Sequence, residues 1–177
     1  YLISTDSLIN KPRLDILFTG TSHSPFIVKD SMGYHEKYTE ELKKLTNRND
    51  RIHFEKYQRF YLTLYNVDDA YRILFNEFKK RPDFENTIFI LTGDHPMTEL
   101  PIENAFTKYK VPMIIYSPKL KEAKHFEGFS SHLDIYETVL AYLKSNFKIE
   151  VPEYSTALGS KINFSENFDI KGEYAFM

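Results

Sequence analysis

The sequence predicts an α/β fold, a layered sandwich with a mainly parallel central sheet flanked by helices. Two short runs rich in β-branched and aromatic residues, 88–92 and 111–118, are typical of strands that are covered on both faces. A long amphipathic pattern at 54–80 lies between the first of these runs and an earlier strand-like stretch at 13–18. Because a helix that joins two strands favours a right-handed crossover, we expect parallel neighbours in one sheet.

The first strand is predicted by alternation. Leu14, Ile16 and Phe18 alternate with other side chains before the chain enters the loop "TSHSPF". The polar stretch 27–52 that follows is expected to be a surface excursion with a short helical patch at 39–45.

The long helix is predicted by spacings of three and four residues. It should end near Arg81, since Pro82 disfavours a helical predecessor. The apolar positions that share its face are Phe60, Leu64, Val67, Tyr71, Leu74 and Phe78. After the two further strands, "SSHLDIYETVLAYL" predicts a second amphipathic helix, which Ser131 and Asp134 open as a capping box. The terminal "EYAFM" is expected to be an edge strand.

Composition limits the classes of function. A chain of 177 residues is most simply one domain, 1–177, and its net charge of −2 gives no support for nucleic-acid binding. The absence of cysteine excludes disulfides, thiolate metal sites and cysteine nucleophiles in this sequence. No apolar run is long enough to span a membrane. Because the first residue is Tyr1 rather than methionine, we expect a piece of a longer protein.

Asp94 and His95 are the first candidate site residues. They directly follow the strand 88–92 and Gly93. At that place the chain can curl, so a carboxylate and an imidazole could bind one Zn²⁺ or Mn²⁺; Ca²⁺ prefers oxygen ligands only. The alternative is an aspartate that caps a turn beside a surface histidine. Thr98 and Glu99 lie within reach of the same place.

His23 and His132 are the next candidates. His23 lies among Thr21, Ser22 and Ser24, where it could donate to an anionic oxyacid or be an ordinary loop histidine. No G-x-S-x-G pattern supports a nucleophile there. His132 opens the second helix, where it could be a ligand, a substrate contact or merely a first-turn residue. The other three histidines, His35, His53 and His125, are expected to be exposed.

Several of these pieces occur together in one family. "YNVDDAYRILFNEFKKRPDFENTIFILTGDHP", then "VPMIIYSP", then "SSHLDIYETVLAYL" resembles the C-terminal half of the alkaline phosphatase superfamily. The resemblance is greatest to lipoteichoic-acid synthase and sulfatase-like enzymes, over roughly residues 13 to 160. It implies that Asp94 and His95 are metal ligands and that His23, within "TSHSPF", contacts the phosphate end of the substrate. His132 fits the "SHLDI" variant of the helix start and stays a candidate for substrate binding.

The resemblance also implies an activity. Family members attack a phosphate or sulfate ester with a metal-activated Thr, Ser or formylglycine. That nucleophile and the remaining ligands belong to the N-terminal half, so no catalytic residue is expected in this chain, which should be inactive in isolation. The expected cofactor is Mn²⁺ or Zn²⁺, because imidazole suits these ions, or Ca²⁺ in a sulfatase.

The expected function is therefore that of a phosphotransferase or phosphoester hydrolase, of the phosphoglycerol or phosphoethanolamine transferase type. The substrate would be a phosphate or sulfate ester linked to a lipid or glycan. Two alternatives stay open, a sulfatase and a non-catalytic relative that binds a glycan or a partner; a purely structural scaffold is a third. Because members of the family that the sequence resembles commonly act outside the cytoplasm, we expect a bacterial protein of the periplasm or cell surface. Any membrane anchor would lie outside this sequence.

Overall fold

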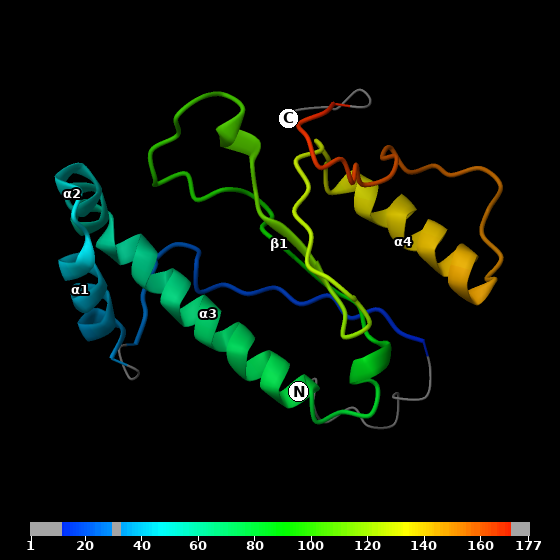
Figure 1. Ribbon diagram of the computed structural model, residues 1–177, viewed down its shortest axis with the longest axis horizontal. Helices are drawn as coiled ribbons and strands as arrows, with labels where there is room; N and C mark the ends of the chain where they lie inside the picture. The colour runs from blue at the N-terminus through cyan, green and yellow to red at the C-terminus, as the bar shows by residue number, and fades with distance from the viewer. Residues whose placement is uncertain (1–11, 30–32, 171–177) are drawn as a thin grey trace. The chain divides into compact units, whose positions relative to one another are not determined.

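The computed structural model describes residues 12–29 and 33–170. The chain divides into two compact units, residues 1–120 and 121–177, and each is considered by itself. No helix in the described ranges is both long and apolar enough to cross a membrane. Figure 1 shows the helices and strands of both units.

Three helices dominate the first unit. They are α1 (Tyr34–Lys44), α2 (Arg48–Lys56) and α3 (Gln58–Phe78). The predicted long helix is thus confirmed, but it is divided at Tyr57, and the patch predicted at 39–45 belongs to a longer α1. Asn47 begins α2, because its side-chain oxygen accepts a hydrogen bond from the backbone N–H of Asn49 at 2.8 Å.

The three helices share a small core. Tyr34, Tyr38 and Leu62 are buried at its centre. Partly buried side chains of Val28, Leu42, Phe54, Tyr61 and Tyr65 pack around them. The Tyr34 hydroxyl donates to Asp69 at 3.0 Å, so this polar group has a partner at the edge of the core.

The strands differ from the prediction in orientation. Strands β1 (Phe89–Thr92) and β2 (Met113–Tyr116) form where expected, but they pair with each other and run antiparallel, with Phe89 opposite Tyr116. The helices and strands of the described residues are compatible with the predicted α/β class, but the only sheet there is this two-stranded antiparallel one, so the mainly parallel sandwich is not observed. An apolar run specifies a strand but not the direction of its neighbour, and here the connection contains only the short 3₁₀ turn η4 (Thr107–Tyr109).

The predicted strand at 13–18 is also not formed. Residues 12–20 have no regular structure, and the side chains of Leu14 and Phe18 are 82% and 87% exposed. A strand exists only where a neighbour satisfies its backbone groups, and in the described part of the chain this segment has no such neighbour. The expected crossover between the first two strands is therefore wrong as well.

An aromatic cluster fixes β1 on α3. The Phe89 ring lies 4.8 Å from that of Phe75 and 5.2 Å from that of Phe78, both on α3. Phe84, from the 3₁₀ turn η3 (Phe84–Asn86), and Tyr116 from β2 complete the cluster. These contacts determine the direction in which β1 leaves the helix, and hence where the residues that follow β1 lie.

The second unit is built on α4 (Leu133–Phe147). The predicted pair closes the turn at its start, where His132 is the N-cap: the Asp134 carboxylate accepts from Ser131 N at 2.7 Å, as in a capping box, while the Ser131 hydroxyl accepts from Leu133 N at 3.2 Å rather than from Asp134 N. Segment 160–163 returns to this helix start, and Ile162 N donates to the Thr138 hydroxyl at 2.8 Å. The predicted edge strand "EYAFM" lies outside the described residues.

Candidate functional site

Asp94 and His95 lie on a bend immediately after β1. Thr92, the last residue of β1, pairs with Met113, and its hydroxyl donates to Pro112 O at 2.9 Å. Beyond this point the Asp94 carboxylate accepts from the backbone N–H of His95 at 3.0 Å, a local turn that bends the chain. The end of the sheet therefore presents both side chains to solvent, 73% and 57% exposed.

The ring of His95 is held so that one nitrogen is available for a metal. Nδ1 lies 2.8 Å from the carbonyl oxygen of Pro96, which assigns the proton to Nδ1 in the neutral ring and leaves a lone pair on Nε2. That Nε2 lies 3.8 Å from Oδ2 of Asp94. Since Zn²⁺ binds nitrogen and oxygen ligands at about 2.0–2.2 Å, one ion can contact both atoms. The pair therefore fits a divalent metal.

The local charge also favours a cation. The hydrogen bond to the Pro96 carbonyl, and then the negative charge of Asp94, raise the pKa of His95; Glu99 adds to this effect. Glu99 thus lies close enough to act on the same ring. The negative charge that favours a protonated imidazole would favour a bound metal ion in the same way.

His23 lies in a turn that is anchored to the start of α3. The turn is closed by His23 N donating to Gly20 O at 3.1 Å and by Phe26 N donating to His23 O at 2.9 Å. Phe26 is buried against Phe60 of α3, with ring centroids 4.9 Å apart. The turn therefore has a fixed place beside the helix and leaves the His23 side chain exposed.

The two predicted loops meet. The rings of His23 and His95 lie edge to face with their centroids 6.2 Å apart. His23 Nδ1 lies 3.1 Å from Ser24 O, so both histidines engage a backbone carbonyl through Nδ1 and present Nε2 elsewhere. An acid, an imidazole that can bind a metal and a second imidazole that can donate to an anion are thus gathered at one place.

The other histidines lie elsewhere. His132 belongs to the second unit, immediately before α4, and is exposed, so its predicted role stays a prediction. His35 and His125 are exposed as expected. The expectation for His53 is wrong: it is half-buried, and its Nε2 lies 2.9 Å from the Tyr61 hydroxyl, because α2 packs this face on α3.

In the ranges 12–29 and 33–170, no three His, Asp or Glu side chains are grouped so that they could hold a metal ion. Asp94 and His95 are therefore a pair of candidate ligands, with no third such side chain grouped with them among the residues that the structure describes.

Sequence reasoning missed the residues that anchor the His23 turn. Arg59 of α3 donates to the carbonyl of Pro25, and its guanidinium lies 5.9 Å from the centre of the Phe26 ring. Arg59 occurs in an ordinary polar stretch of the helix, and Phe26 follows a proline in a loop. Neither position carries a pattern that could have indicated the contact, which only the tertiary structure creates.

Comparisons with known proteins bear on the family of the chain. The sequence pattern of a family described as Sulfatase matches residues 1–145. A phosphopentomutase from Clostridium botulinum (strain Alaska E43 / Type E3) is 32% identical over 69 residues, which cover 39% of this chain and 16% of that protein. The match thus spans about a sixth of the length of that curated relative. No solved structure matched the chain.

Proposed function

The chain belongs to the sulfatase family, within the alkaline phosphatase superfamily, and on this premise we propose that it contributes to a metal-dependent enzyme acting on phosphate esters. Asp94 and His95 supply two ligands of a divalent ion, and His23 orients the anionic group of the substrate. The observation that carries the proposal is the 6.2 Å approach of the His23 and His95 rings, from two loops far apart in the sequence.

The division of roles follows from the chemistry of each group. The Asp94 carboxylate accepts only, so it binds cations and repels a phosphate. His95 offers the Nε2 lone pair because its Nδ1–H is directed at the Pro96 carbonyl. His23, when protonated, donates to an anionic oxygen and adds one positive charge. A Mn²⁺ or Zn²⁺ ion bound here would supply Lewis-acid polarisation of the ester oxygen.

Phosphate is preferred over sulfate as the transferred group for two reasons. The imidazole ligand suits Mn²⁺ or Zn²⁺ better than the oxygen-preferring Ca²⁺. The relative from Clostridium botulinum is named as a mutase of a phosphopentose. A phosphoglycerol- or phosphoethanolamine-type transferase remains the finer proposal, together with an extracytoplasmic location and a lipid- or glycan-linked substrate. Sulfate-ester hydrolysis is the second candidate, which the name of the matching family favours.

Mn²⁺ binding tests the metal site. Titration followed by electron paramagnetic resonance should show that Asp94→Ala and His95→Ala each weaken binding at least about tenfold, since even outer-shell partners of a metal contribute 10- to 100-fold. His125→Ala removes an exposed histidine elsewhere and should leave the affinity unchanged. Because Mn²⁺ is paramagnetic, it should also broaden the NMR signals of the His23 ring. Equal affinities for all four proteins would exclude this metal site.

A second measurement separates the two ester classes. With Mn²⁺ present, ³¹P NMR should detect bound inorganic phosphate, and His23→Ala should weaken that binding while Mn²⁺ affinity persists. Inorganic sulfate at the same concentration should displace little phosphate. Displacement of most of the phosphate would instead favour the sulfatase alternative.

A further inference from the structure

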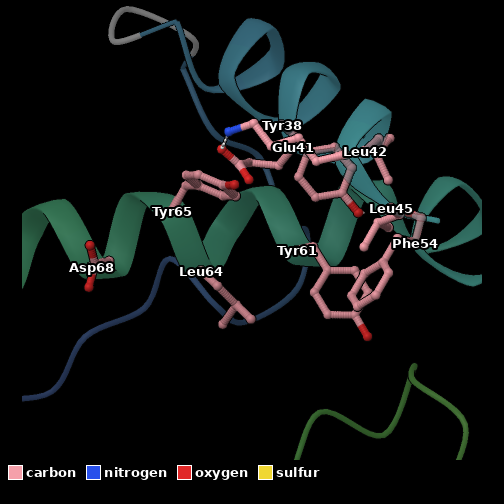
Figure 2. Close-up of a pocket in the computed structure, with 10 residues that line it drawn as sticks. Tyr38, Glu41, Leu42, Leu45, Phe54, Tyr61, Leu64, Tyr65 and Asp68 are labelled. Carbon is pink, nitrogen blue, oxygen red and sulfur yellow. Dashed lines mark hydrogen bonds and ion pairs between the residues drawn. The ribbon is translucent and has the colours of Figure 1, made fainter. Parts of the chain in front are cut away.

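A pocket of the first unit lies among the three helices, and no residue of the His23 or His95 loop lines it. It has a volume of about 460 Å³. Figure 2 shows its walls, which are formed by side chains of α1, α2 and α3 and by Leu45, which follows α1. A volume of this size is typical of sites for small molecules, which combine apolar walls with few polar groups.

The walls are mainly aromatic and are held in place. Tyr38 donates its hydroxyl to Phe54 O at 2.7 Å, and the Tyr61 hydroxyl is bonded to His53. The rings of Phe54 and Tyr61 lie 4.7 Å apart, and those of Tyr38 and Tyr65 lie 6.0 Å apart. Burial raises the pKa of Tyr38 to about 12, so its hydroxyl stays neutral. The aromatic surface is therefore fixed before any ligand arrives.

The charged side chains that line the pocket sum to one negative charge. Lys44 forms an ion pair with Glu41 at 2.5 Å, so these two charges balance. Asp68, one turn along α3 from Leu64, has no hydrogen bond or ion pair to any described residue. The charge of Asp68 acts on Arg72, but the guanidinium of Arg72 is held by Asp69 at 2.7 Å, so these three residues together also carry one net negative charge. The lining therefore carries a net charge of about −1, located at Asp68.

We propose that this pocket binds an organic cation, an ammonium group carried on an apolar body. The negative faces of tyrosine rings attract cations, and an unpaired carboxylate beside them adds to that attraction. The apolar body would lie against Leu42, Leu64 and Phe54. A neutral ligand of the same shape would gain only the apolar contacts, and an anion would be repelled by Asp68.

The test compares two probes with the same apolar body, 2-phenylethylammonium and 2-phenylethanol. Binding to the full 177-residue chain is measured by NMR titration of the tyrosine ring signals. We expect the cation to bind about threefold to tenfold more tightly than the alcohol, from the magnitude of cation–π and exposed charge contacts. Asp68→Asn should remove that preference, whereas Glu55→Gln, an exposed acid of α2 outside the pocket, should retain it.

A blocking variant keeps the test independent of Asp68. Leu64 is 43% exposed, so Leu64→Lys should fold, which circular dichroism checks, and should place a positive charge of the protein itself at the pocket. Loss of cation binding in this variant supports the proposal. Equal affinity of the two probes, tighter binding of the alcohol, or unchanged cation affinity in both Asp68→Asn and Leu64→Lys overturns it.

Discussion

Substitution of the buried carboxylate at the start of α4 should strongly destabilise the second unit. Asp134 is 1% exposed. Its Oδ2 accepts from Ser131 N at 2.7 Å, and its Oδ1 accepts from Ser160 N at 2.7 Å and from the Ser160 hydroxyl at 3.2 Å. In Asp134→Asn, an amide NH₂ must replace one of these oxygens. In either orientation of the amide, its NH₂ group lies opposite a backbone N–H, and an NH₂ group cannot accept a hydrogen bond.

The expected cost follows from these contacts. Hydrogen bonds to a charged acceptor contribute about 1.5–3 kcal/mol each, and one of the two short bonds is lost. Loss of the negative charge at a helix N-terminus adds about 0.3–1 kcal/mol. We therefore expect Asp134→Asn to lower the free energy of unfolding by about 2–4 kcal/mol. Ser160→Ala, which removes only the 3.2 Å bond, should cost about 1 kcal/mol.

Urea unfolding followed by circular dichroism measures these differences, and hydrogen exchange at the Ser160 amide locates them. Glu150→Gln is the matched control, because Glu150 is an exposed acid just beyond α4. The order expected is Asp134→Asn, then Ser160→Ala, then the control. If Asp134→Asn is within about 0.5 kcal/mol of the control, the carboxylate does not tie segment 160–163 to the helix.

Two predictions concern the first unit. Phe89→Ala should lower the free energy of unfolding by about 3 kcal/mol, at the low end for a phenylalanine because the ring is only half-buried, and thermal unfolding should show it. Asp83→Asn should cost about 3 kcal/mol, because Arg81, whose side chain is 5% exposed, loses its carboxylate at 2.9 Å. The hydrogen bond from Arg81 lowers the pKa of Asp83 from its ordinary value of 3.8. The contribution of Asp83 is therefore complete above that value and is lost as the pH falls through the lowered pKa. Unfolding measured between neutral and acid pH should show this loss in the wild type but not in Asp83→Asn.

Much of the local structure could be read from the sequence. The apolar runs gave the ends of β1 and β2 to within two residues, and Ser131 with Asp134 gave the start of α4. Such features depend on backbone geometry and on residues a few positions apart in the chain, so a short stretch of sequence is enough to encode them. The pairing of β1 with β2 could not be read, since the same run is compatible with either direction of a neighbour.

For the candidate site, too, the sequence predicted one part and missed another. The sequence pointed to Asp94, His95 and His23 by their chemistry and by resemblance, but it contained no measure of the distance between them. The half-buried state of His53 and the role of Arg59 were missed, because both depend on helix packing between segments that have no common pattern.

The sequence by itself indicated which side chains are suited to metal and anion binding, where α3, α4, β1 and β2 form, and to which family the chain belongs. Only the tertiary structure decided that β1 and β2 run antiparallel and that His23 and His95 lie 6.2 Å apart. The physical reason is the distance along the chain over which the interactions act. Helix periodicity and capping act over a few residues, whereas the packing of Phe26 on Phe60 and of Phe89 on Phe75 sets distances between segments that the order of residues leaves open.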